Sequence, residues 1–504
     1  MPSGGLNVRG LVGLLGVLIA ALTVEFNDGV VSTALADVRG GLGISSDAGT
    51  WLTSLFSSGQ VFGMAIATFW AVTVSIRRWL LFAIALTCVS TVTVPFTSNV
   101  GLLFVLRFLE GLGSGFIIPL LLTVALQVLP PAIRLYGLAP YALTATFGPN
   151  VSTALAALWT DGVGWEFVFY QDLPLCTLAG LLVWYGVKQD LPDYTRIRQF
   201  DWRGALLVGI GFGALTTMLE QGNRLDWFNS PLICVLGLLS AVALPLLVWN
   251  DLYAEVPLYR FSLLKRRNYT FALITLFTFL LLNLSAGTIP LRYLTEVSGF
   301  RPEQTYVVTL LIAVPQFLLL PAIAALLDFE WVDARWVLFA GLCCVIAACV
   351  GNSLLTSVWD AKSFFISQGL QAVGAPLVVM PLLMIAVNTI KDPSEGPFAS
   401  TLVNTMRAVA EPVGVWMFEL IQHWRGALHY NRIVDQSGLG SFSAVEQHSP
   451  AAVRAFHEAV EAQAAVLTLS DTFVIIGVIA VVLVGVLAVL PERTYPPRIV
   501  AAQK

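Results

Sequence analysis

Two carboxylic acids stand in an apolar stretch of the chain where ionised groups are energetically expensive. Glu25 and Asp28 occur in TVEFNDGVVSTALADV (residues 23–38), and the run from Gly10 to Ala36 carries no other charge. Because they are three residues apart, they share one face of a helix. A charge at the centre of a membrane helix costs about 2.5–3.5 kcal/mol on insertion scales, so the pair indicates a polar cavity, an ionic partner or a functional role.

A second apolar run carries Arg107 and Glu110, one helical turn apart in RFLEGLGSG. Counted from the outer ends of their spans at about 1.5 Å per residue, Asp28 and Glu110 lie at a similar depth of about 12 Å. If the two spans are neighbours, Arg107 faces up to three carboxylates, and at least one of these should hold a proton. Such a carboxyl suits proton coupling. The alternative is an inert ion pair of Asp28 with Arg107 that locks two helices together.

Further polar residues are candidates for lining a substrate cavity. Arg407 and Glu411 are four residues apart and can pair along their own helix. Asn404 lies in the same span, and Gln316 and Gln371 lie in two others; hydrogen bonding between helices explains all three equally well. Glu220 ends the seventh predicted span and Asp172 lies about two turns into the sixth. A position at the membrane interface rather than in the interior explains both, so they rank lower.

The elements that position these residues are membrane helices. The chain has 504 residues, of which 57% are hydrophobic and 12% are charged, whereas soluble domains are about 25% charged. Several uncharged runs reach about 20 residues, the length that a helix needs to cross the hydrocarbon core. The runs are continuous rather than alternating, which excludes a membrane β-barrel. We therefore predict an all-α membrane protein.

Charged and turn-forming residues divide the chain into fourteen predicted spans. They cover about 10–36, 48–76, 79–98, 102–129, 136–159, 166–187, 204–222, 231–250, 268–293, 304–327, 336–358, 363–390, 396–422 and 470–491. The even number places both termini on one side. Roughly twice as many Lys and Arg residues fall on that side as on the other, so the positive-inside rule predicts that both termini are cytoplasmic. The segment 423–469 is then an extracytoplasmic loop.

The predicted spans fall into three parts. Residues 1–190 form an N-terminal group of six helices, residues 191–262 hold two extra helices, and residues 263–504 form a C-terminal group of six helices. RFLEGLGSG from Arg107 and QGLQAVGAP from Gln368 share a spacing of polar and small residues, and each opens the fourth span of its group. Two related groups around a central site are typical of secondary transporters.

The sequence offers no pattern for a metal or a cofactor. The six cysteines lie in apolar runs without metal-ligand spacing, and the four histidines lie at irregular intervals between residues 423 and 457. We interpret the cysteines as packing residues and the histidines as surface residues. The net charge is −4 and no basic patch suggests nucleic acid, so we expect no nucleic-acid partner.

Several motifs together resemble the major facilitator superfamily, and within it the fourteen-span drug:proton antiporters of the EmrB/QacA type. The first-span motif is similar to NDGVVSTALADV, with Asp28 at its Asp, and the fourth-span motif to LRFLEGLGSGFIIPL, with Arg107 at its Arg. The antiporter motif of the fifth span resembles FGPNVSTALAALWTDG, with Gly148 and Pro149 at its Gly-Pro. FDWRGALLVGIGFGALTTMLEQGNRLDWFNS is similar to the two extra central helices of this branch.

The chain departs from the family pattern at several places. The loop between the second and third spans keeps only Arg77 and Arg78 of the charged signature that latches the inward-closed state. Ser152 and Thr153 replace the Gly-Gly that ends the antiporter motif. Acids stand at positions where the family usually has neutral residues, namely Glu25, Glu110, Asp172 and Glu411. These acids favour a cationic or amine-bearing substrate.

The resemblance implies a fold and a function. We expect the major facilitator fold, with two six-helix halves plus two extra central helices, in the cytoplasmic (inner) membrane of a bacterium. We expect a proton-coupled secondary transporter that exports small amphipathic or cationic compounds by alternating access. Asp28 is the expected coupling carboxylate, and Arg107 tunes its pKa. Glu25, Glu110 and Glu411 are further candidate sites for the proton or the substrate. In Gram-negative members a periplasmic adaptor and an outer-membrane channel are the implied partners.

Two alternatives stay open. A specific metabolite or siderophore transporter would use the same fold, and the missing latch signature and the additional acids favour it. A membrane-embedded enzyme would need a nucleophile, a metal or an acid–base cluster near one interface. The histidines lie outside the spans and the cysteines are scattered, so we do not expect an enzyme.

Overall fold

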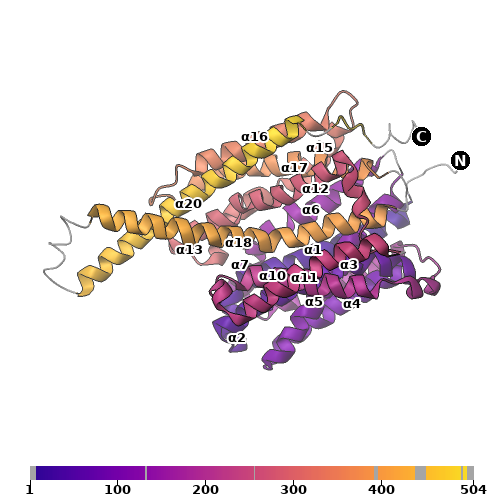
Figure 1. Ribbon diagram of the computed structural model, residues 1–504, viewed down its shortest axis with the longest axis horizontal. Coiled ribbons are helices and arrows are strands. Elements are labelled where there is room, and N and C mark those ends of the chain that lie inside the picture. Colours follow the sequence, from indigo (N-terminus) through magenta and orange to yellow (C-terminus); the bar gives the residue numbers. More distant parts are fainter. Residues whose placement is uncertain are drawn as a thin grey trace.

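The computed structural model describes residues 7–130, 133–254, 256–390, 395–437, 450–489 and 492–496. Within these ranges all regular structure is helical, as the sequence predicts. Figure 1 shows the long helices running roughly side by side in one bundle.

The N-terminal helices run from α1 to α9. Their bounds are α1 (Val8–Thr33), α2 (Leu35–Leu42), α3 (Ser46–Val74), α4 (Ile76–Thr93), α5 (Val100–Val128), α6 (Arg134–Thr146), α7 (Gly148–Gly162), α8 (Phe167–Tyr170) and α9 (Asp172–Gly186). Caps fix several of the starts: the Asn99 side chain accepts a hydrogen bond from the Leu102 amide, 3.1 Å away, and so satisfies one of the free amides of α5.

Two further helices, α10 (Trp202–Gln221) and α11 (Pro231–Tyr253), connect the N-terminal helices to a C-terminal group. That group contains α12 (Arg267–Leu282), α13 (Thr288–Glu296), α14 (Tyr306–Ala313), α15 (Gln316–Leu327), α16 (Ala334–Asn352), α17 (Phe365–Asn388), α18 (Gly396–Ser437) and α20 (Pro450–Val489). Short 3-10 helices complete it, including η6 (Asn283–Ser285) and η7 (Pro302–Thr305).

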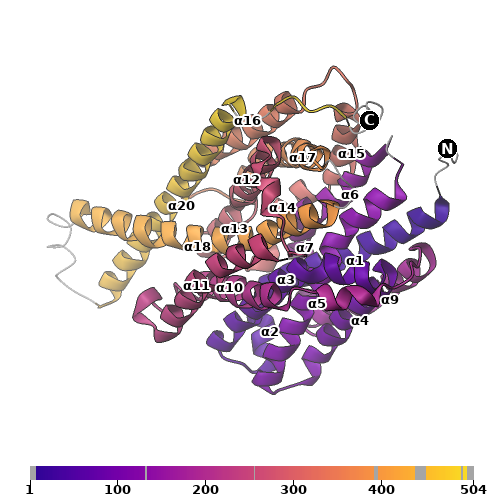
Figure 2. The ribbon, with the colours of Figure 1, turned by 45° about the vertical axis from the view of Figure 1, so that its right-hand side comes forward.

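The two groups of helices lie on opposite sides of a seam. Helices α1–α9, indigo to violet, pack with one another, and α12–α20 lie across from them (Figures 1 and 2). Contacts across the seam join α7 to α14, α6 to α15 and α17, and α3 and α5 to α18. Helix α10 packs on both α3 and α18, with α11 on its outside. The predicted boundaries at 190/191 and 262/263 fall between α9 and α10 and between α11 and α12, and the division into three domains stays a prediction.

The predicted number of spans is matched only in part. Twelve helical segments within the described residues are long and apolar enough to cross a membrane. The predicted span 136–159 is not among them, because it is split at Phe147 into α6 and α7. The predicted span 396–422 is not among them either, since it lies in the polar 42-residue helix α18. Both segments are helical, but the count of fourteen crossings stays a prediction.

Much of the segment 423–469, which we predict to be an extracytoplasmic loop, is helical; its side of the membrane stays a prediction. Helix α18 continues to Ser437 and α20 begins at Pro450, and Figure 1 shows this pair projecting beyond the other helices. Where the two helices meet, Arg425 Nε donates to Asp471 Oδ2 over 2.7 Å, and His429 Nε2 lies 2.5 Å from the same oxygen. Residues 450–469 therefore belong to α20; residues 438–449 lie outside the described ranges.

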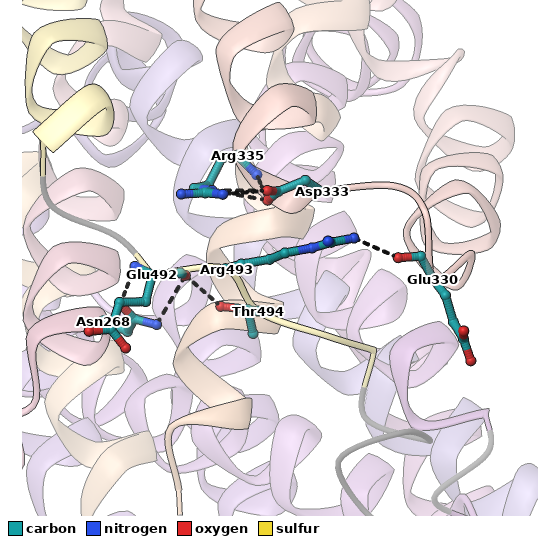
Figure 3. Close-up of polar contacts among 7 residues, drawn as sticks. All are labelled: Asn268, Glu330, Asp333, Arg335, Glu492, Arg493 and Thr494. Carbon is teal, nitrogen blue, oxygen red and sulfur yellow. Dashed lines mark hydrogen bonds and ion pairs between the residues drawn. The ribbon is translucent and has the colours of Figure 1, made fainter.

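The last described segment ties together one end of the C-terminal group. The Glu492 amide donates to Asn268 Oδ1 over 2.9 Å, and Arg493 Nη2 donates to the Glu330 carbonyl over 2.9 Å (Figure 3). Asp333 beside it binds Arg335 over 2.7 Å. The start of α12 and the loop between α15 and α16 are thus held by residues 492–493.

Candidate functional site

Close packing of α3 and α5 places Arg107 and Glu110 inside the N-terminal group. A Cβ at Gly111 would lie 2.1 Å from the Phe56 carbonyl oxygen, and one at Gly59 would lie 2.3 Å from the Phe108 carbonyl oxygen. Only glycine allows these backbones to approach so closely. The side chains of α5 along this contact with α3 therefore point into the protein rather than to lipid.

Arg107 and Glu110 form a fully buried ion pair. Arg107 Nη1 lies 2.9 Å from Glu110 Oε1, and both side chains are 0% exposed. Arg107 Nε also donates to the Leu52 carbonyl over 3.2 Å, and its guanidinium lies 4.7 Å from the centre of the Phe56 ring. These contacts fix Arg107 between α3 and α5.

A second buried carboxyl joins this pair through Asn27. Asn27 Nδ2 donates to Glu110 Oε1, to Asp172 Oδ2 over 3.1 Å and to Thr91 Oγ1 over 3.2 Å. Asp172 is 0% exposed, so its predicted position at the membrane interface is wrong. The prediction failed because the sixth span begins with the short helix α8, which places the first residue of α9 well inside the protein.

The charges of this cluster do not balance when both acids are ionised. Glu110 and Asp172 share the single guanidinium of Arg107, and within the described residues Glu110 Oε2, Asp172 Oδ1 and Arg107 Nη2 have no hydrogen-bond partner. An uncompensated buried charge is very costly. One proton shared by the two carboxyls makes the cluster neutral.

Glu25 lies on another face of α1 and pairs across the seam. Arg407 Nη2 of α18 lies 2.5 Å from Glu25 Oε1, and the two side chains are 11% and 12% exposed. Arg407 Nη1 also donates to Thr144 Oγ1 of α6 over 3.0 Å. The pairing of Arg407 with Glu411 along one helix, which the spacing allows, is therefore replaced by a pair between α18 and α1. The expectation that Arg107 faces Glu25 as well as Glu110 and Asp28 is likewise wrong, because Glu25 belongs to Arg407.

Asp28 and three other acids approach the same seam. Asp28 interacts electrostatically with Glu411, Glu25 and Glu220, and also with Arg107. It is half-buried, whereas Glu411 on α18 is exposed. Arg107 is thus the basic residue that acts on Asp28, whereas Arg407 binds Glu25. Glu25 and Asp28 share one face of α1, as predicted from their spacing.

The break between α6 and α7 packs directly on these acids. Pro149 stands in the first turn of α7, where its missing amide costs little. A Cβ at Gly148 would lie 2.7 Å from Glu25 Cβ, and one at Gly29 would lie 2.4 Å from Ser152 Oγ. The space that Gly29 leaves on α1 thus accommodates Ser152, one of the two residues that replace the Gly-Gly of the family motif.

The predicted cavity residues have different surroundings. Arg407 lines a small cavity of about 20 Å³ at the seam, together with Tyr141 and Asn283. Asn404 Oδ1 accepts a hydrogen bond of 2.8 Å from the Tyr141 hydroxyl. A cavity of this size holds about one water molecule.

Gln316 and Gln371 hold helices of the C-terminal group together. Gln316 Nε2 donates to the Ile312 and Ala372 carbonyls, both over 3.0 Å, and Gln371 Nε2 donates to Ser285 Oγ over 2.7 Å. Gln371 occupies the repeat position of Glu110, and Gln368 that of Arg107. The repeat in the C-terminal group is therefore neutral where the N-terminal group carries a charged pair.

A charged contact that the sequence reading missed closes one end of the seam. Arg301, just before η7, lies 3.1 Å from Asp37 of α2 and 3.0 Å from Asp161 of α7. Its third acidic neighbour, Glu303, is 3.4 Å away. These carboxylates, Glu303 first, raise the pKa of Arg301 above its ordinary value. The three partners lie in segments between predicted spans, where spacing alone carries no signal of contact.

Comparisons with known proteins agree with this fold. The profile described as "Major Facilitator Superfamily" matches residues 17–415. "Fatty acid resistance protein FarB" of Neisseria gonorrhoeae is 25% identical over 407 residues, which cover 81% of this chain and 79% of FarB. "Multidrug export protein EmrB" of Escherichia coli K12 is 23% identical over 427 residues, which cover 84% of this chain and 82% of EmrB.

Solved structures support the same architecture. A POT family transporter in complex with a thioalcohol-conjugated peptide aligns with a TM-score of 0.58 at 13% identity, and the alignment covers 94% of this chain and 96% of that one. The proton:xylose symporter XylE aligns with a TM-score of 0.55 at 13% identity and covers 98% and 99%. At such identities the likeness concerns the fold alone.

Proposed function

We propose that this chain, which belongs to the Major Facilitator Superfamily, is a proton-coupled exporter of small amphipathic or cationic compounds. The names of its relatives, among them multidrug export and multidrug resistance proteins, support export of such compounds. The fold supports transport by alternating access, in which the two groups of helices rock about a central site. The chain is then a transporter rather than an enzyme.

The observation that carries the proposal is the ion pair of Glu25 with Arg407 across the seam. Rocking requires that contacts between the two groups form and break, and this contact depends on the charge of one carboxylate. A proton on Glu25 removes its attraction for Arg407, so protonation weakens the tie between α1 and α18. A proton can shift the equilibrium between two conformations only if it binds one of them better, and the pair supplies that difference.

Asp28 is the proposed coupling carboxylate. It interacts with Arg107 and with acids at the seam, so its protonation changes the charge that all of these groups meet. An ionised Asp28 attracts a cationic substrate to the seam, and a proton on Asp28 releases that substrate. Glu411, exposed on α18, is a second contact for a cation. Proton binding and substrate release are then coupled through the charge of Asp28.

The cluster of Arg107, Glu110 and Asp172 supplies a neighbouring proton site. Asn27 connects both carboxyls and lies one residue before Asp28. A proton held between Glu110 and Asp172 lets Arg107 interact more strongly with Asp28. Arg107 thus tunes the proton affinity of Asp28, as the family resemblance implies. The two buried acids set how much of the Arg107 charge is available to Asp28.

The location and the partners are part of this proposal. The protein is multi-pass in the membrane, and we place it in the inner membrane of a bacterium with both termini in the cytoplasm. From the family resemblance we also propose an assembly with a periplasmic adaptor and an outer-membrane channel. With this orientation the projecting ends of α18 and α20 lie on the periplasmic side, where such an adaptor would meet the transporter.

Uptake of a fluorescent cationic dye into inverted vesicles under an imposed pH gradient tests the function. We expect gradient-driven uptake by the wild-type protein and its loss in Asp28→Asn. Competition by structurally unrelated amphipathic cations supports multidrug export, whereas competition by a single metabolite supports the alternative of a specific transporter. Uptake that is unchanged in Asp28→Asn would remove Asp28 from the mechanism.

A further inference from the structure

A groove that the transport mechanism does not use lies where α10 begins and α11 ends. It has a volume of about 540 Å³ and is lined by residues 198–201, by Arg203 and Leu207 of α10, and by residues at the end of α11. This end of α10 follows α9 and the 3-10 helix η3 (Tyr194–Gln199). In the proposed orientation the groove faces the cytoplasmic leaflet of the membrane.

The groove has a net positive charge. Arg198 and Arg203 line it and are both exposed. The acid among the lining residues is Asp201, and both of its oxygens are engaged: Oδ1 accepts from the Gly204 amide over 2.8 Å, and Oδ2 accepts from Asn250 Nδ2 over 2.5 Å. Asp201 thus caps α10 and ties it to α11. No ion pair among the described residues involves either arginine of the groove.

The walls next to these arginines are apolar and face lipid. Trp249 and Tyr253 of α11 line the groove and are 61% and 79% exposed. In the most apolar stretch of α11 only 22% of the residues are buried inside the protein. Trp and Tyr concentrate at the level of the lipid headgroups. The groove therefore combines a cationic rim, an aromatic belt and an apolar floor at the membrane surface.

We propose that this groove binds the phosphate headgroup of an anionic phospholipid. Arg198 and Arg203 contact the phosphate, for which the planar guanidinium is well suited, and the acyl chains lie along Leu207 and Leu246. Basic sites between membrane helices on the cytoplasmic side are known to suit acidic headgroups. Because α10 packs on both α3 and α18, the bound lipid lies beside an element that contacts both groups of helices.

Native mass spectrometry of the purified full-length protein, titrated with phosphatidylglycerol, tests this proposal. We expect one molecule to bind about tenfold more tightly than phosphatidylcholine. The double variant Arg198→Gln/Arg203→Gln should lose about thirtyfold in affinity, since each arginine near an anionic surface contributes about fivefold. Both side chains are exposed, so thermal unfolding should be unchanged, and each single variant should show an intermediate loss.

Arg196→Gln is the matched control. Arg196 lies on the same 3-10 helix but pairs with Asp193 over 3.2 Å and does not line the groove, so its substitution should leave lipid affinity unchanged. Equal affinity of the wild type and the double variant would overturn the proposal. So would equal binding of phosphatidylcholine, which would indicate an apolar groove only. Displacement of the lipid by millimolar inorganic phosphate would point instead to a site for free phosphate and would also overturn it.

Discussion

Arg407 of α18 and Glu25 of α1, which are 382 residues apart in the chain, form an ion pair of 2.5 Å across the seam between the two groups of helices. The Arg407 side chain also donates to Thr144 and so contacts two helices of the N-terminal group. This one side chain therefore senses the charge of Glu25 and holds the two groups together. Because this contact between the two groups depends on the charge of a single carboxylate, it is the physical basis of the proposed coupling.

Removal of Arg407 should impair transport without unfolding the protein. In Arg407→Gln, dye uptake should fall on the order of tenfold, since about 1.4 kcal/mol of lost stabilisation changes a rate by that factor. Arg425→Gln is the control, because Arg425 pairs with Asp471 of α20 within the C-terminal group and should leave uptake unchanged. Equal uptake in the wild type and Arg407→Gln would show that the pair has no part in transport.

Removal of Arg107 should destabilise the protein, and removal of a carboxylate with it should restore much of the loss. Arg107→Gln leaves Glu110 and Asp172 without a cation, and breaking a buried pair in this way costs about 3–5 kcal/mol. The double variant Arg107→Gln/Glu110→Gln removes the unpaired charge as well. Thermal unfolding in detergent measures both. A double variant as unstable as Arg107→Gln would contradict the charge count of this cluster.

An alanine at Gly148 should interfere with the site through space rather than through charge. The added methyl group would lie 2.7 Å from Glu25 Cβ, so α7 and α1 must move apart and shift Glu25 away from Arg407. We expect Gly148→Ala to lower dye uptake severalfold. Gly162→Ala is the matched control on α7, because nothing lies within 4 Å of a Cβ there. Equal effects of the two substitutions would show that helix propensity, and not the contact with Glu25, is responsible.

Loss of Arg301 should open the seam at the end that carries Asp37 and Asp161. A cysteine introduced at Asn283, which lines the central cavity, reports this opening through its reaction with a membrane-impermeant thiol reagent in intact cells. Labelling should be faster in Arg301→Gln than in the parent. Arg292→Gln serves as the control, since Arg292 pairs with Glu296 within α13. Unchanged labelling in Arg301→Gln would mean that these ion pairs do not close the outer end.

The sequence predicts the parts of the site that depend on a single helix. The three-residue spacing of Glu25 and Asp28 gives their common face, and the same spacing brings Arg107 and Glu110 together. Long apolar runs give the positions of most helices to within a few residues, but not the extension of α18 to Ser437 or the start of α20 at Pro450. The Gly-Pro of the antiporter motif marks the start of α7, because proline removes one amide and is tolerated in a first turn.

Contacts between distant helices could not be predicted in this way. Periodicity shows which face of a helix is polar but not which helix packs against it, so the partner of Glu25 was misjudged. The depth of Asp172 depends on how α8 and α9 share one span. The contacts of Arg301 form only when three connecting segments meet. The family motifs indicate which helices are neighbours. They do not indicate the partners of the acids that depart from them, because other family members have neutral residues at those positions.

Proton release on substrate binding tests the central claim most directly. Purified protein in weakly buffered detergent solution, with a pH-indicator dye, should release protons when a transported cation is added, because the cation and the proton compete for Asp28 and Glu25. Asp28→Asn should release fewer protons, and Asp28→Asn/Glu25→Gln should release none while remaining folded. Release of the same number of protons by the wild type and by the double variant would contradict the account.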